Sequence, residues 1–139
     1  MHKTDRTPFV RSCTAALLLA LCASVSAQAN LPKLAPAYEG YWKNLEFPVT
    51  SDMSITIDKL EPDGSVTGTF SRAARYCATR GTALKGKLTG NVLEIVPDFS
   101  AEMLCKDTRF TLQVQPDGSL AGEGESYFKL RVVLKPVAK

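Results

Sequence analysis

Residues 40–70 read GYWKNLEFPVTSDMSITIDKLEPDGSVTGTF and join two alternating apolar runs through a Pro-Asp-Gly turn. Met53, Ile55 and Ile57 occupy every second position with polar residues between them, a period that is typical of a half-buried β-strand. In the turn, residues 62–64, proline has a fixed φ and glycine accepts a positive φ, and together they close a hairpin. The stretch therefore predicts antiparallel strands joined by a tight turn.

The same design recurs downstream. Residues 110–124 read FTLQVQPDGSLAGEG, with the same alternation and a second Pro-Asp-Gly turn, and residues 90–91 are a Gly-Asn pair that suits a third tight turn. Eight strands are predicted, at residues 39–45, 53–58, 66–70, 82–89, 92–96, 110–114, 120–128 and 130–134.

The spacing of the turns predicts how the strands connect. The three tight turns link the second strand to the third, the fourth to the fifth and the sixth to the seventh, so in a meander they lie at one end. The opposite end then carries the longer connections, residues 46–52, 71–81 and 97–106. We predict an all-β fold, an eight-stranded antiparallel up-and-down meander barrel with one disulfide, and a β-sandwich of the same strands is the alternative.

The first 27 residues have the pattern of a secretory signal peptide. Three basic residues precede an apolar segment: Lys3, Arg6 and Arg11. The apolar segment, residues 13–22, is about half of the roughly 20 residues that a membrane-spanning helix needs, so no membrane span is expected. Small residues offer cleavage after Ala27 or Ala29. A lipoprotein modified at Cys22 is the alternative, but Leu21 stands where a small residue is expected before it.

The remaining chain suits one domain. Residues 28–37 contain two prolines and are predicted to be an extended lead-in, and residues 38–139 form the β-barrel domain. Loss of three basic and one acidic residue with the signal lowers the formal net charge from +3 to +1. We therefore expect no nucleic-acid partner.

Two cysteines remain after the signal. An even pair in an exported domain predicts a disulfide between Cys77 and Cys105, which fall in two of the longer connections. Closing a loop of about 28 residues should stabilise the fold by roughly 3 to 4 kcal/mol. Because there is no Cys-x-x-Cys spacing, we expect a structural role for the pair. The predicted location is periplasmic or secreted.

The residues that remain do not suit catalysis. The one histidine is His2, inside the signal, so the mature chain has no imidazole for a general base, a nucleophile pair or a metal site. Acidic residues such as Asp63 and Asp117 fall in turns, where solvated carboxylates are common. The sequence therefore predicts a protein that is not an enzyme and has no cofactor and no metal ligand.

The connection at residues 71–81, SRAARYCATRG, is the strongest binding candidate. Arg72, Arg75 and Arg80 could meet the carboxylates or phosphates of a ligand or of an acidic protein, and Tyr76 lies among them. The alternative interpretation is a charged loop that keeps an exported protein soluble.

A resemblance to a known family covers about 30 residues. Residues 40–44, GYWKN, resemble the G-x-W-x-N opening strand of the avidin and streptavidin family, and residues 63–70, DGSVTGTF, are similar to its D-G-x-[FL]-T-G-T-Y. The resemblance implies a calycin-type barrel. The G-x-W element is also the lipocalin start, where an arginine from the end of the barrel covers the tryptophan, a role for which Arg131 is the candidate.

The same resemblance implies site residues. Asn44 and Ser51 would lie where the family binds the head group of biotin, and Trp42 and Phe70 are the further ligand-binding candidates of this stretch. Two of these positions depart from the family pattern: Phe70 replaces a tyrosine whose hydroxyl is a hydrogen-bond donor, and Ser51 lies three residues further along the chain than the family's serine. The chain also has a single tryptophan, so the set of aromatic side chains that encloses biotin in that family is absent. We expect no tight binding of biotin.

An eight-stranded barrel is just wide enough to be filled by its own side chains or to hold one small ligand, and the sequence leaves both possibilities open. We predict an exported binding protein that takes a small apolar or amphipathic ligand at its loop-rich open end. The alternative is a periplasmic or extracellular protein-protein interaction module, or a hydrolase inhibitor, that acts through the disulfide-tied loops. The oligomeric state is left open.

Overall fold

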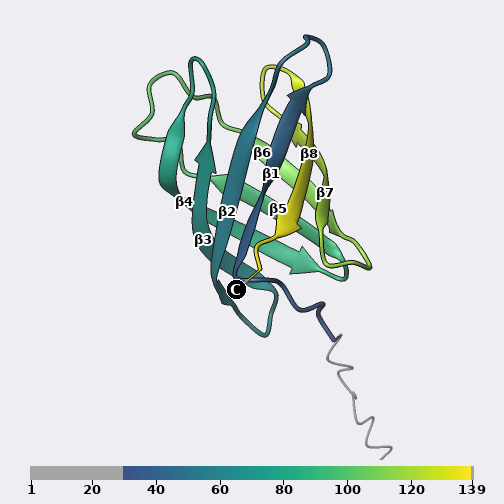
Figure 1. The fold of residues 1–139 in the computed structure, drawn as a ribbon. Coiled ribbons are helices and arrows are strands. Elements are labelled where there is room, and N and C mark those ends of the chain that lie inside the picture. Colours follow the sequence, from purple (N-terminus) through teal and green to yellow (C-terminus); the bar gives the residue numbers. More distant parts are fainter. Residues whose placement is uncertain (1–29, 139) are drawn as a thin grey trace, which may run out of the picture.

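The computed structural model describes residues 30–138, which form a closed barrel of eight antiparallel strands (Figure 1). The strands are β1 (Ala37–Asn44), β2 (Thr50–Leu60), β3 (Ser65–Arg72), β4 (Thr79–Thr89), β5 (Val92–Pro97), β6 (Arg109–Val114), β7 (Leu120–Glu125) and β8 (Lys129–Pro136). Each strand pairs with its neighbours in sequence, and β1 pairs with β8 to close the barrel. The predicted meander barrel is confirmed, and the sandwich alternative is wrong. The predicted signal peptide lies outside the described residues.

Period-two alternation separates the inside of the barrel from the outside. In β5, Leu93 and Ile95 are buried whereas Glu94 and Val96 are exposed. The buried side chains from all eight strands, together with Phe99, form one continuous core. The core residues are Tyr38, Trp42, Met53, Ile55, Val66, Phe70, Leu84, Leu88, Leu93, Ile95, Phe99, Phe110, Leu112, Leu120, Leu130, Val132 and Leu134.

The two ends of the barrel differ as predicted. The closed end carries the tight turns at residues 61–64, 90–91 and 115–119, and the loop-rich end carries the connections at residues 45–49, 73–78, 98–108 and 126–128. Figure 1 shows the longer connections at the top and the C-terminus at the bottom. Either end of the described chain is therefore remote from the loop-rich end.

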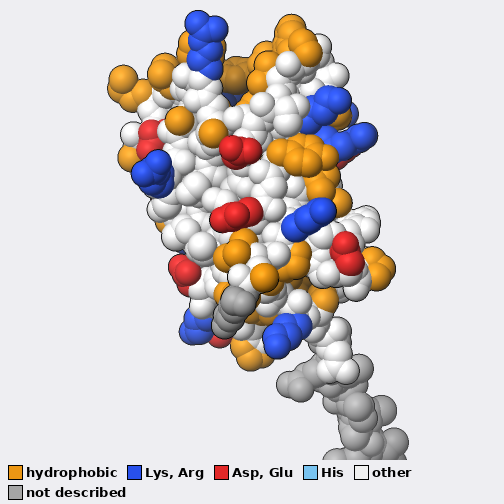
Figure 2. Space-filling model, in the orientation of Figure 1, with side chains coloured by type: hydrophobic (Ala, Val, Ile, Leu, Met, Phe, Trp, Pro, Cys, Tyr) orange, Lys and Arg blue, Asp and Glu red, His pale blue; other side chains and the backbone are white. Residues whose placement is uncertain are grey.

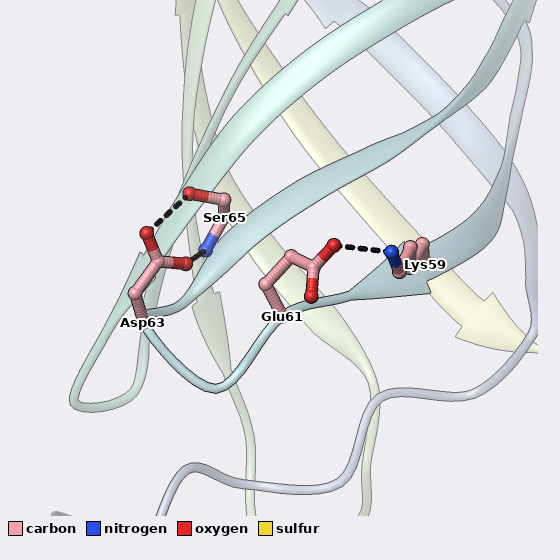
Figure 3. A network of polar contacts seen from close by, with 4 residues as sticks. All are labelled: Lys59, Glu61, Asp63 and Ser65. Carbon is pink, nitrogen blue, oxygen red and sulfur yellow. Dashed lines mark hydrogen bonds and ion pairs between the residues drawn. The ribbon is translucent and has the colours of Figure 1, made fainter.

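Side-chain hydrogen bonds fix the tight turns. In the turn between β2 and β3, the Asp63 carboxylate accepts from the Ser65 amide at 2.8 Å and from the Ser65 hydroxyl at 3.0 Å (Figure 3). Lys59 and Glu61 form an ion pair beside it. Asp117 accepts from the Ser119 amide and hydroxyl at 2.9 and 2.6 Å in the matching turn. These bonds lower the pKa of both aspartates, through the backbone first for Asp63 and through the hydroxyl first for Asp117.

The lead-in packs against the closed end. Leu31 and Leu34 are partly buried against the core, and the Ile57 amide donates to the Pro36 carbonyl at 2.9 Å. The Ala35 amide donates to the Tyr38 hydroxyl at 2.8 Å, and burial raises the pKa of that phenol. Residues 30–36 therefore belong to the folded unit.

Glycines bring the barrel walls close together. A Cβ at Gly68 would overlap the Thr56 carbonyl oxygen, and a Cβ at Gly122 would overlap that of Thr111. The Phe110 ring lies only 2.6 Å from where a Cβ of Gly124 would be. These glycines permit close approach of backbone and ring, so they do not open space for a ligand.

Aromatic rings fill the barrel interior next to the loop-rich end. The ring of Phe70 has no exposed surface, and its centroid lies 5.5 Å from that of Phe110 and 5.7 Å from that of Phe99. Because Phe99 comes from the connection at residues 98–108, that loop contributes to the core as well as to the surface.

Strand ends differ from the sequence expectation by a few residues. β2 begins at Thr50, although alternation indicated Met53, and β7 ends at Glu125, although Phe128 was expected. The Ser126 amide donates to the Phe128 carbonyl at 3.2 Å and closes a short hairpin there. Residues 50–52 of β2 are all polar, so apolar alternation does not mark the start of this strand. Within residues 30–138 no helix is long and apolar enough to cross a membrane.

Candidate functional site

The disulfide joins two loops at the loop-rich end. Cys77 of the connection at residues 73–78 is bonded to Cys105 of the connection at residues 98–108, with their Cα atoms 4.9 Å apart. The predicted disulfide is therefore confirmed. It holds the two loops together through cysteines that are 28 residues apart in sequence.

The loop at residues 98–108 is anchored on both sides of its tip. Phe99 lies in the core, and Thr108 is buried where β6 begins. At the tip, Met103 is 98% exposed and Leu104 is 72% exposed. The Cys105 amide donates to the Glu102 carbonyl at 3.0 Å, so the tip is a closed turn. The result is a braced projection with an apolar end.

Asp98 braces the start of this loop. Its carboxylate accepts from the Ser100 amide at 3.0 Å. Hydrogen bonds from the Ser100 hydroxyl and amide, in that order of size, hold the pKa of Asp98 below its ordinary value. The Asp98 amide in turn donates to the Ala83 carbonyl of β4 at 2.8 Å. The loop is thus tied to the barrel wall where it leaves β5.

Exposed apolar side chains surround the loop-rich end. We call this set the apolar rim; it consists of Leu45, Phe47, Val49, Tyr76, Met103, Leu104, Tyr127 and Phe128. Eight of the eleven exposed large hydrophobic side chains of the described residues belong to it. Figure 2 shows hydrophobic side chains gathered along the upper edge of the molecule, over these loops.

Contacts between side chains order the rim. The rings of Phe47 and Phe128 meet edge to face, with centroids 5.2 Å apart, and join the first loop to the last. Lys106 Nζ lies 3.9 Å from the centroid of Tyr127, and Arg75 Cζ lies 5.3 Å from that of Tyr76. Cation–π contacts of this kind hold aromatic rings in place at exposed sites.

Arg72 lies beneath the rim, inside the mouth of the barrel. Its guanidinium is 5.6 Å from the Trp42 ring centroid and 5.8 Å from that of Phe99. It donates through Nε to the Cys77 carbonyl at 3.3 Å and through Nη2 to the Cys77 Sγ at 2.6 Å. Burial lowers the pKa of Arg72.

Arg72 therefore takes the position over the tryptophan. The expectation for Arg131 is wrong, because that residue is exposed on the outer face of β8 and lies beside Lys43 in the register with β1. Alternation along β8 directs Leu130 and Val132 inward and leaves Arg131 outside.

The residues singled out by the family resemblance are used within the fold. Trp42 is 7% exposed, and its Nε1 donates to the Ala73 carbonyl at 3.2 Å. The Asn44 Oδ1 accepts from the amides of residues 46 and 47 at 2.8 and 3.1 Å, and so caps the turn after β1. Ser51 is partly buried opposite Trp42 in the register of β1 and β2, and Phe70 is fully buried.

The remaining candidates are on the surface but do not form one cluster. Arg75 and Tyr76 are exposed on the loop at residues 73–78, whereas Arg80 is exposed on the outer wall at the start of β4. Arg80 lines an open hollow of about 760 Å³ on that wall, together with Asp52 and Ser71 among others. Arg72 lines the same hollow, so Arg72 and Arg80 share it, whereas Arg75 and Tyr76 are not among its lining residues.

Sequence reasoning did not identify most of the rim. Met103 and Leu104 are adjacent apolar residues outside any alternating run, which is the one signal that could have identified them. The sequence pattern places Tyr127 and Phe128 in a strand, whereas β7 ends at Glu125. Their exposure depends on where β7 ends, which the sequence pattern does not show.

A scan against protein-family models, a search of curated proteins and a search of solved structures found no match to this chain.

Proposed function

We propose that this is an exported, non-enzymatic binding protein that docks a protein partner at its loop-rich end. The observation that carries the proposal is the apolar rim. Its side chains are between 40% and 98% exposed and gather at one end of the barrel. Exposed apolar surface concentrated in this way is typical of interaction sites. The rim also contains tyrosines, a methionine and an adjacent arginine, residue types that are enriched at protein interfaces.

The packing of the barrel favours a protein partner at the rim over a small ligand held inside the barrel. A ligand in the calyx would take the space of the Phe70, Phe99 and Phe110 rings, which are at most 4% exposed, and Phe70 contacts both of the others. Displacing such rings would cost several kcal/mol, because protein interiors are close-packed.

The shape of the rim indicates the form of the partner. The tip at Met103 and Leu104 projects from a loop braced by Phe99 and by the disulfide of Cys105. A convex, ordered apolar tip fits a concave cleft, and its order reduces the entropy lost on binding. We therefore infer that the partner presents a cleft, as a hydrolase does at its active site, and that docking there would obstruct it.

The family resemblance supports the scaffold only. A closed eight-stranded antiparallel barrel is consistent with a calycin-like fold. We do not extend the resemblance to biotin, because Asn44 Oδ1 is engaged in its own turn and Phe70 contributes no hydroxyl. The predicted signal and the disulfide support export.

The test is capture of a partner by the mature protein, immobilised through a C-terminal tag that leaves the loop-rich end free. We expect a protein from periplasmic extract to be retained by the wild type and lost with Met103→Asp/Leu104→Asp. The matched control is Val96→Asp, on the outer wall of β5 and 42% exposed, which should retain it.

The captured protein is then purified and its Kd measured by calorimetry. We expect the double variant to bind at least about tenfold more weakly than the wild type or the control. Equal affinity of the double variant and the control would contradict docking at the rim. Native mass spectrometry that found a small molecule retained by the purified barrel would instead favour the small-ligand prediction.

A further inference from the structure

We propose that the Cys77–Cys105 disulfide is a directional thiol–disulfide exchange site, in which an incoming thiolate attacks Cys105 and Cys77 departs as a thiolate paired with Arg72. The inference rests on the position of the Arg72 guanidinium, whose Nη2 lies 2.6 Å from the Cys77 Sγ. It does not depend on the proposed partner.

Among the described residues, 30–138, no carboxylate pairs with the Arg72 guanidinium. Arg72 is 9% exposed and lies over the rings of Trp42 and Phe99. The ion pairs found within residues 30–138 are Lys59 with Glu61 and Lys87 with Asp63, so no carboxylate of this part of the chain lies within 4.0 Å of Arg72. A buried, unpaired charge is costly, and an anion beside it relieves that cost.

Reduction supplies that anion. The released Cys77 thiolate would form at a sulfur that already lies beside the Arg72 guanidinium, so the two partners of the ion pair are neighbours before reduction. A neighbouring cation lowers the pKa of a cysteine thiol and stabilises the thiolate. The reduced form gains an interaction that the disulfide lacks, which raises the reduction potential of the pair.

Burial sets the direction of attack. Cys77 is 9% exposed, whereas Cys105 is partly exposed on the loop at residues 98–108. A low-molecular-weight thiolate therefore reaches the Cys105 sulfur and forms a mixed disulfide there, as the Cys77–Cys105 bond breaks and its electron pair leaves on Cys77. Departure is faster when the leaving thiol has a low pKa. A second thiolate then attacks the small-molecule sulfur of the mixed disulfide, which releases Cys105 and yields the oxidised reductant.

The exchange acts on the two loops that carry Tyr76, Met103 and Leu104. Reduction would remove the covalent brace between them. Any effect of reduction on docking rests on the proposed function, but the exchange chemistry of Cys77 and Cys105 does not. The docking proposal and the exchange proposal can therefore fail separately.

The first test measures the Cys77 thiolate by its absorbance at 240 nm as a function of pH in Cys105→Ser. We expect a pKa at least about one unit below the ordinary value of about 8.5. In the same background, Arg72→Met should return the pKa to or above the ordinary value, and Arg72→Lys should restore part of the decrease. Cys105 measured in Cys77→Ser is the control and should titrate higher. A Cys77 pKa equal to that of Cys105, or unchanged by Arg72→Met, would overturn the proposal.

The second test uses the wild-type protein and so does not depend on how the variants fold. The oxidised protein is mixed with glutathione, free thiols are trapped with N-ethylmaleimide, and the adducts are mapped by mass spectrometry. We expect glutathione mainly on Cys105 and N-ethylmaleimide on Cys77. Glutathione found mainly on Cys77, or equally on both cysteines, would refute the direction of exchange.

Discussion

Arg72 and Trp42 stack inside the mouth of the barrel, with the guanidinium carbon 5.6 Å from the indole centroid. Phe99 contacts the same guanidinium at 5.8 Å, so Arg72 joins β3 to the loop at residues 98–108. The stem of a buried arginine also packs as an apolar chain. These contacts make Arg72 a structural element of the mouth as well as the neighbour of Cys77.

We expect Arg72→Ala to lower the free energy of unfolding by about 2 kcal/mol, because it removes two cation–π contacts and the packing of the stem. Relief of the buried charge offsets part of this loss. Urea denaturation followed by Trp42 fluorescence measures it. Arg75→Ala and Arg80→Ala, at exposed positions, should change stability by no more than about 0.5 kcal/mol. An Arg72→Ala protein as stable as these controls would show that the stacking contributes nothing.

Removal of the disulfide should destabilise the barrel strongly. For a sequence separation of 28 residues, Cys77→Ala/Cys105→Ala is expected to lose about 3 to 4 kcal/mol, since the unfolded chain regains the entropy of an open loop. Chemical denaturation of the variant and of the wild type measures the difference. Reduced wild-type protein should lose less than the variant, because it keeps both cysteine side chains and the Cys77 thiolate can pair with Arg72. A loss below about 1 kcal/mol would contradict the entropic estimate.

Gly68→Ala should cost more than about 2 kcal/mol or prevent folding, because the new Cβ would overlap the Thr56 carbonyl oxygen of the neighbouring strand. Thermal and urea unfolding of the variant test this expectation. The control is Thr67→Ala, the adjacent and exposed position of β3, where the change is expected to stay within about 1 kcal/mol. If Gly68→Ala is as stable as the control, the walls are less closely packed than the structure shows.

Stability should fall at acid pH through the two matching turns. The folded state lowers the pKa of Asp63 and Asp117, so the stabilisation they supply is complete above the unfolded value near 3.8 and is lost as the pH falls below it. Unfolding of Asp63→Asn/Asp117→Asn, measured by urea at pH 7 and pH 3, should therefore show a smaller decrease than that of the wild type.

Two further variants test how much of this pH dependence comes from the serine hydroxyls. Ser65→Ala and Ser119→Ala keep both carboxylates but remove the hydroxyl donors at 3.0 and 2.6 Å. They should reduce the acid sensitivity in part, and more at Ser119, where the hydroxyl has the largest effect on the pKa. An identical pH dependence in the wild type and the double asparagine variant would show that these turns do not titrate with folding.

The barrel itself could be predicted from local patterns, whereas the apolar rim could not. Alternation at Met53, Ile55 and Ile57 and the turn at residues 62–64 are local properties of the chain, and residues 110–124 repeat them. Exposure of Met103 is different, because it depends on Phe99 and Cys105 being held on either side of it. Arg72 could be identified as a candidate, but its contact with Trp42 could not, since the two residues lie on strands that are not adjacent in the barrel.

The sequence by itself determined the eight antiparallel strands, the contrast between a closed end and a loop-rich end, and the disulfide. Alternation and turn residues are visible within a few neighbouring positions, and two cysteines allow only one pairing. Only the tertiary structure decided that the interior is filled, that Arg72 and not Arg131 covers Trp42, and that the exposed apolar side chains gather at one rim. These features depend on the closure of β1 against β8 and on the close approach of the walls at glycines, which bring together residues from every strand and loop.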